Sequence, residues 1–155
     1  MKLLLQLFFG VFLVMSSSIS YSQTMIPLEQ FVKERNGSDP SELSYVGQRC
    51  STLFSVIGTL LRENGTSKDL LTISTLENKS SVIRNVSLSL DLGVNKKSPE
   101  AIIKQSKQFN EIYTKQLVKN KQLNNNYFDG YIKTDLEICN SLYPKFEELN
   151  KIVPK

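Results

Sequence analysis

Two cysteines, Cys50 and Cys139, restrict the fold of this chain more than any other feature. Each lies in a segment whose apolar residues recur every three or four positions, which is the spacing of one helix face. Because there is no third cysteine, an intramolecular disulfide has a single possible pairing, and two buried free thiols or an intermolecular bridge are the alternatives. The first and last helices of an antiparallel four-helix bundle are neighbours, so a Cys50–Cys139 disulfide predicts that the first and last segments pack together.

The first 22 residues have the pattern of a secretory signal. One lysine precedes an apolar run from Leu3 to Val14, and a serine-rich stretch ends at Ser22. An uncleaved membrane anchor is the alternative, but an apolar run of ~12 residues is shorter than the roughly 20 that a spanning helix needs. We therefore expect cleavage after Ser22, or alternatively after Ser20, and no membrane segment afterwards. Export to the periplasm or the extracellular medium would supply the oxidising conditions that a disulfide requires.

The chain contains no histidine, which removes the usual catalytic base and the usual zinc ligand. No serine lies in a G-x-S-x-G elbow, and the glycines are isolated rather than grouped in a phosphate-binding loop. We therefore predict a non-enzymatic protein with no catalytic residue, no cofactor and no metal site. The net charge is only +4, and basic and acidic residues are interspersed.

A group of lysines in the third segment is the one candidate for nucleic-acid binding. It can form a basic stripe or simply a solvated helix face, and export favours the solvated face. We therefore predict no nucleic-acid partner. These residues are Lys104, Lys107, Lys115, Lys119 and Lys121.

Residues 23–40 are predicted to be a flexible lead-in with at most a short helical turn around 28–33, because they end in a cluster of turn-forming residues. Residues 41–155 are predicted to form a single helical domain. Three of its four segments, 41–64, 98–124 and 128–149, have clear helical spacing. A kink or break is expected before Pro144, because proline cannot donate a backbone hydrogen bond.

The second segment, 67–92, fits two patterns. Leu70, Ile73, Leu76 and Ile83 fall on one helical face, whereas Val86 to Val94 alternate as a strand would. We favour a helix and retain a β-hairpin as the alternative. The predicted fold is an all-α, up-and-down bundle of about four helices whose first and last members are joined by one disulfide.

Several residues suggest sites but also have simpler explanations. The Asp129–Gly130 loop resembles a calcium loop, yet Leu136 stands where an EF-hand needs a glutamate. Asp135 and Glu137 are two residues apart and therefore lie on different helix faces. Gly47 and Gly58 inside the first helix indicate close packing or, alternatively, a small ligand cavity. A set of tyrosines marks either the edge of the core or a partner surface: Tyr113, Tyr127, Tyr131 and Tyr143.

The functional prediction is correspondingly broad. We expect an exported, non-enzymatic helical protein that binds a partner protein or a small ligand in the periplasm. The alternative is a secreted, glycosylated helical signalling ligand, since four N-x-S/T sequons occur. Whether they carry glycans depends on the source. The sequons are at Asn36, Asn64, Asn78 and Asn85.

Overall fold

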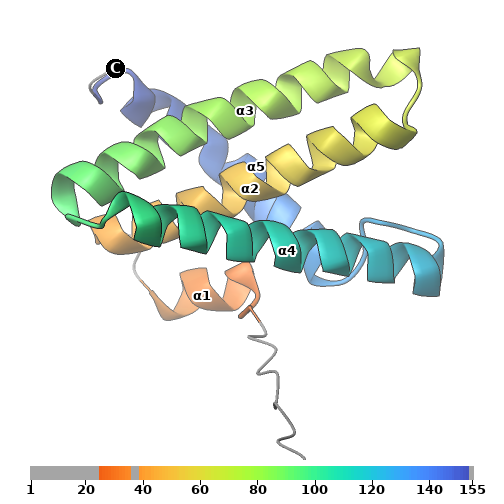
Figure 1. Cartoon of the computed structure of the whole chain (residues 1–155), viewed down its shortest axis with the longest axis horizontal. Coiled ribbons are helices and arrows are strands. Elements are labelled where there is room, and N and C mark those ends of the chain that lie inside the picture. Colours follow the sequence, from red (N-terminus) through yellow and green to blue (C-terminus); the bar gives the residue numbers. More distant parts are fainter. Residues whose placement is uncertain (1–24, 36–38, 154–155) are drawn as a thin grey trace, which may run out of the picture.

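The computed structural model describes residues 25–35 and 39–153, and within these ranges the chain is helical and contains no strand (Figure 1). The predicted signal at 1–22 and the sequon at Asn36 lie outside the described residues. The α-helices of the described part are α1 (Leu28–Glu34), α2 (Pro40–Asn64), α3 (Leu70–Ser89), α4 (Pro99–Asn124) and α5 (Tyr131–Asn150).

The starts of α2 and α4 follow from their local sequences. Asp39 accepts a hydrogen bond from the backbone N–H of Ser41 at 2.7 Å, and Ser98 accepts one from Ala101 at 3.2 Å. A proline occupies the first position of each helix, where a missing N–H costs nothing. A short polar residue directly before a proline is thus the local signal that begins both helices.

Helix α2 is the centre of the arrangement. It runs antiparallel to α3, and α4 and α5 also pack against it (Figure 1). Most of the fully buried residues of α2 lie in its first two thirds, from Ser44 to Gly58. The prediction of an all-helical bundle of about four long helices is confirmed, as is the Cys50–Cys139 disulfide. This bridge links α2 to α5 with a Cα–Cα distance of 5.3 Å, and both cysteines are fully buried.

The second segment is helical, as favoured, and not a hairpin. A short 3₁₀ turn, Ser67–Asp69, precedes α3, and a π-helical turn, Leu90–Val94, follows it. Helix α5 continues through Pro144, so the predicted break does not occur. The fully buried Phe146 beyond the proline holds the last turns of α5 against the core.

Helix α1 differs from the flexible lead-in that the sequence predicts. The short helix is where a helical turn was expected, but it packs against α5. Leu28 is fully buried, and its backbone N–H donates to Asp135 Oδ1 at 2.8 Å. The partner lies 107 residues away, so no local pattern could reveal this attachment.

Gly47 and Gly58 have different surroundings. A Cβ at Gly47 would collide with the Ser87 hydroxyl and come within 2.9 Å of the Phe146 ring, so close packing requires glycine there. A Cβ at Gly58 would meet only ordinary contacts, at 3.9 Å. The close-packing interpretation therefore holds for Gly47 alone.

Candidate functional site

Helix α2 buries two adjacent polar residues, Gln48 and Arg49, and each belongs to a separate polar cluster. The Arg49 cluster consists of Arg49, Tyr113 and Asp135. The Gln48 cluster consists of Gln48, Asp91, Asn95 and Lys97. A buried polar group is costly unless it is hydrogen-bonded, so the partners of each cluster indicate its role.

The Arg49 cluster is fully enclosed and internally paired. Arg49 Nη2 donates to Asp135 Oδ2 at 2.6 Å, and the Tyr113 hydroxyl donates to the same oxygen at 2.7 Å. Arg49 also donates through Nε to the Tyr113 oxygen at 3.2 Å and through Nη1 to the Ile26 carbonyl at 2.6 Å. All three side chains are inaccessible to solvent. This arrangement joins α2, α4 and α5 to the segment before α1 and offers no approach to a substrate.

Burial determines the protonation of Tyr113. Desolvation raises the pKa of its hydroxyl well above the ordinary value, although the nearby Arg49 charge acts in the opposite direction. A tyrosine hydroxyl is protonated at neutral pH in any case, and burial extends that state to higher pH, so the hydroxyl can donate to Asp135. The cluster is a structural ion pair rather than an acid–base site.

Gln48 lines a cavity between α2, α3 and α4, which we call the α2–α3–α4 pocket. Its volume is about 290 Å³, at the lower end of the range for small-molecule sites. It combines hydroxyl groups, two basic side chains and an apolar wall, and no acidic residue lines it. The lining residues are Gln48, Ser51, Thr52, Arg84, Ser87, Leu88, Ile102, Ile103, Ser106 and Lys107.

Gln48 has an unsatisfied acceptor. Its Nε2 donates to Asp91 Oδ2, but within residues 25–35 and 39–153 its buried Oε1 has no hydrogen-bond partner. Exchanging the two amide atoms would place Oε1 against the Asp91 carboxylate, so the orientation is fixed by charge. Gln48 is only 4 % exposed, and an unpaired carbonyl at such depth costs on the order of 1–3 kcal/mol.

Asp91 is held ionised by the residues around it. Burial by itself would raise the pKa of its carboxyl, but hydrogen bonds from Ser44, Lys97 and Asn95 hold the pKa below the ordinary value. Lys97 Nζ lies 2.9 Å from Asp91 Oδ1, and Asn95 Nδ2 lies 3.1 Å from the same oxygen. The negative charge behind Gln48 is therefore balanced by Lys97.

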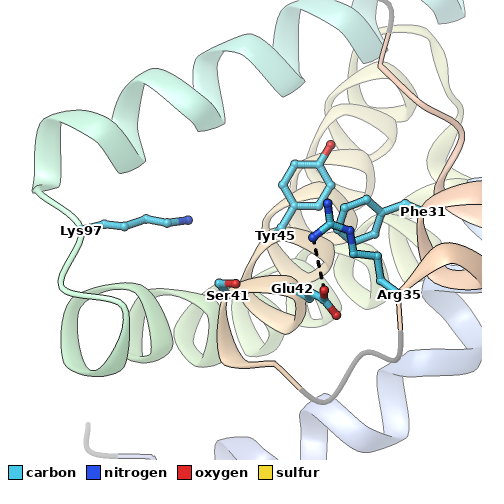
Figure 2. Close-up of a pocket in the computed structure, with 6 residues that line it drawn as sticks. All are labelled: Phe31, Arg35, Ser41, Glu42, Tyr45 and Lys97. Atoms are coloured by element: carbon cyan, nitrogen blue, oxygen red, sulfur yellow. Dashed lines mark hydrogen bonds and ion pairs between the residues drawn. The ribbon is translucent and has the colours of Figure 1, made fainter.

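A second hollow, the α1–α2 pocket, has a volume of about 210 Å³ (Figure 2). Its charged groups already have partners: Arg35 pairs with Glu42 at 3.3 Å and lies over the Phe31 ring, and Lys97 pairs with Asp91. Figure 2 shows the Arg35 guanidinium between Phe31 and Tyr45 with its contact to Glu42. The α2–α3–α4 pocket, with its unpaired Gln48 acceptor, is therefore the stronger candidate. The residues around the α1–α2 pocket are Phe31, Arg35, Ser41, Glu42, Tyr45 and Lys97.

The other candidate residues of the sequence, in the Asp129–Gly130 loop and at Asp135 and Glu137, do not come together as a site. Asp129 accepts a hydrogen bond from the Gly130 N–H at 2.8 Å, and the Asn120 side chain binds the Asp129 carbonyl at 2.9 Å, so this loop is a turn. Asp135 is buried whereas Glu137 is exposed, and the two do not form a pair. Across the described ranges, no group of three or more Cys, Asp or Glu residues is placed to hold a metal ion.

The tyrosines are divided between the core and its edge. Tyr113 is fully buried, whereas Tyr127, Tyr131 and Tyr143 pack partly buried against the core. Burial also raises the pKa of Tyr131, to about 12. Their packing against the core agrees with the core-edge interpretation rather than an open partner surface.

No sequence motif marks Gln48, Asp91 or Arg49 as a site. One signal was present: Arg49 follows Val46 by three positions and precedes Leu53 by four, so it falls on the buried stripe of α2. Ser44, Gln48 and Ser51 repeat the same spacing beside it, and all three are buried. A polar stripe at helical spacing next to an apolar one can therefore mark a buried polar site.

Two further findings bear on the class of protein. None of the helices in the described part of the chain has the length and apolar character needed to cross a membrane. Comparisons with family models, with curated proteins and with solved structures find no match to this chain.

Proposed function

We propose that this chain is an exported, non-enzymatic protein that binds a small ligand in the α2–α3–α4 pocket. The observation that carries the proposal is the buried Gln48 Oε1, which has no partner among the described residues and belongs to a residue that lines a cavity. Native proteins pair almost all such atoms, so an acceptor left unpaired beside a cavity supports binding at this place. The cavity size suits a small molecule rather than a peptide.

Export is supported by the signal pattern of residues 1–22 and by the buried disulfide. It can be tested by fractionating cells that express the full chain and measuring the intact mass of the protein. We expect a product that starts at Gln23 or Tyr21 in the periplasm or medium, with the two cysteines oxidised. A full-length product retained in the cytoplasm would contradict export.

Ligand binding can be tested with a variant that fills the cavity. Ser106 is partly buried and lines the pocket from α4, so Ser106→Phe would occupy the space with a ring. Gln108→Phe adds the same ring at an exposed position of α4 that does not line the pocket, and it is the matched control. In a metabolite screen by native mass spectrometry, ligands that bind the wild type and Gln108→Phe but not Ser106→Phe would support the proposal. Equal binding by all three would place the site elsewhere and contradict it.

A secreted, glycosylated helical ligand is the alternative function. The observation in its favour is that Asn64, Asn78 and Asn85 are all exposed. Protein from the native host would then run as a ladder that collapses on deglycosylation. A single band that enzymatic deglycosylation leaves unchanged would argue against this alternative.

A further inference from the structure

The accessible lining of the α2–α3–α4 pocket comes from the end of α3 and the start of α4. The last turns of α3 supply Arg84 and Leu88, and the first turns of α4 supply Ile103, Ser106 and Lys107. Both stretches lie near the point where the π-helical turn leads the chain from α3 towards α4 (Figure 1). The three α2 residues of the lining are at most 7 % exposed, so the class of ligand follows from the side chains of α3 and α4.

Two of these accessible side chains are cations without an ion-pair partner. Arg84 and Lys107 are exposed, and neither forms an ion pair with another residue of the described ranges. No acidic residue lines the pocket, and the buried Asp91 charge is balanced by Lys97. Because Arg84 and Lys107 line the same cavity, an anionic group bound there would be attracted by both charges.

The accessible lining beside these cations is largely apolar. Ile103 is 55 % exposed, Leu88 is partly buried, and the buried Ile102 lies behind them in the same cavity. A purely polar anion would leave the side chains of Ile103 and Leu88 in water. An alkyl chain laid against them would remove apolar surface from water on both partners, which favours binding.

We infer that the pocket binds an anionic amphiphile, a free carboxylate on a short single aliphatic chain, with the carboxylate near Arg84 and Lys107 and the chain against Leu88 and Ile103. This inference rests on the proposed function and specifies its ligand class. A cavity of about 290 Å³ suits a chain of about eight carbons rather than the two long chains of a phospholipid.

The test uses three matched probes with the mature, oxidised protein. Octanoate has the charge and the chain, octanamide has the same chain without the charge, and acetate has the charge without the chain. Binding is followed by NMR titration and by calorimetry. We expect octanoate to bind at least about tenfold more tightly than either of the other two, because octanamide loses the charge-assisted contacts and acetate loses the apolar burial.

Variants of the two cations test the position of the carboxylate. Arg84→Gln and Lys107→Gln should each weaken octanoate binding by about tenfold, since each removes one charge-assisted contact, and should leave octanamide binding unchanged. Lys104→Gln is the control, because Lys104 is exposed on α4 but does not line the pocket. An equal loss of octanoate binding in the control would show that only the overall charge matters, and it would overturn the inference.

A second pair of variants tests the position of the chain. Ile103→Thr should weaken octanoate binding by about threefold, because it removes apolar contact from the cavity. Val118→Thr makes a similar change at an exposed residue of α4 that does not line the pocket, and it should have no effect. Equal effects of the two substitutions would contradict a chain bound against Ile103.

The remaining outcomes separate the inference from the proposed function. Octanamide binding as tight as that of octanoate, abolished by Ser106→Phe, would overturn the anionic head group and leave the proposed function standing. Sedimentation of the protein with vesicles of phosphatidylglycerol and phosphatidylcholine, without binding of free octanoate, would indicate a membrane surface as the partner and overturn the inference. If none of the probes binds, the inference is wrong, and the metabolite screen with Ser106→Phe then decides the proposed function.

Discussion

Gln48 and Arg49 are consecutive buried residues of α2, yet they differ in how many of their polar side-chain atoms have a hydrogen-bond partner. Arg49 has three partners, and every polar side-chain atom of its cluster is hydrogen-bonded. Gln48 has one partner for its amide nitrogen and, among the described residues, none for its oxygen. A satisfied buried network holds a structure together, whereas an incomplete one beside a cavity is suited to binding. The contrast separates the structural part of this molecule from its candidate site.

The disulfide is a second link between α2 and α5, beside the Arg49 cluster. Cys50 follows Arg49 directly on α2, and Cys139 follows Asp135 by one helical turn on α5. The disulfide and the ion pair therefore join the same two helices at adjoining positions. If this region carries the stability of the fold, changes here should cost far more than changes at Gln48.

The largest effect is expected from removing the disulfide with the Cys50→Ala/Cys139→Ala double variant. The bridge closes a loop across 89 residues, and its loss should lower the free energy of unfolding by about 4 kcal/mol, because the unfolded chain gains conformational freedom. Urea unfolding measures the difference. A loss below about 1 kcal/mol would show that the α2–α5 contact does not depend on the bridge.

A slightly smaller loss is expected for Asp135→Ala. The substitution leaves the fully buried Arg49 charge unpaired and removes the acceptor of the Leu28 N–H. The free energy of unfolding should therefore fall by about 3–4 kcal/mol. Glu137→Ala, at an exposed position of the same helix, is the control and should change stability by less than about 0.5 kcal/mol. Equal effects of the two substitutions would mean that the Arg49 cluster is not a structural centre.

Gln48→Met should have a smaller effect. The thioether has a similar length and the variant removes the unpaired Oε1, but the buried Asp91 Oδ2 loses its donor, so the free energy of unfolding should fall by about 1–2 kcal/mol. Ligand affinity should fall even though the protein stays folded. Thermal unfolding measures stability and calorimetry measures ligand affinity on the same samples. A loss of stability as large as that of Asp135→Ala would end the distinction between the two clusters.

The two clusters should also respond to opposite extremes of pH. The pKa of Asp91 is lower in the folded protein than its ordinary value. Asp91 therefore stabilises the fold above the ordinary carboxyl pKa, and this stabilisation is lost as the pH falls through the folded pKa. The pKa of Tyr113 is higher in the folded protein than its ordinary value. Tyr113 therefore stabilises the fold below the ordinary tyrosine pKa, and this stabilisation declines as the pH rises towards the folded pKa. Asp91→Asn should therefore flatten the acid limb of stability against pH, and Tyr113→Phe the alkaline limb.

Urea unfolding at a series of pH values provides the measurement for both limbs. Glu148→Gln, at an exposed position of α5, serves as the control and should leave the profile unchanged. An acid limb that is the same in wild type and Asp91→Asn would show that Asp91 is not held ionised by its neighbours.

Much of the fold was predictable because it depends on local patterns. The helix signals act within a few residues of sequence: the caps at Asp39 and Ser98, and the apolar spacing of α2, α4 and α5. They predict the helices. The disulfide was predictable because each cysteine lies on the apolar face of its own helix and the chain has no third cysteine. Residues 67–92 were ambiguous because leucines in alternation fit two periods, and packing of Ile83 and Val86 against α2 and α5 selects the helix.

The candidate site was not predictable in the same way. Glycine at position 47 indicated close packing or a cavity, and the cavity borders the next residue, Gln48. However, Gln48 and Asp91 are separated by 43 residues, and only the way α2 packs on α3 and the π-helical turn brings them together. The same applies to Lys97, whose role as the counter-charge of Asp91 depends on the turn after α3.

The sequence by itself determined that 41–64, 98–124 and 128–149 are helical, which cysteines can pair, and that the usual histidine-based chemistry is absent, because these follow from local periodicity and composition. Tertiary structure alone decided that α1 packs on α5, that Arg49 is paired and that the Gln48 acceptor, beside a basic cavity, has no partner among the described residues. The physical reason is that burial and hydrogen-bond satisfaction depend on which distant residues meet, and helical spacing specifies a buried face without naming its partner.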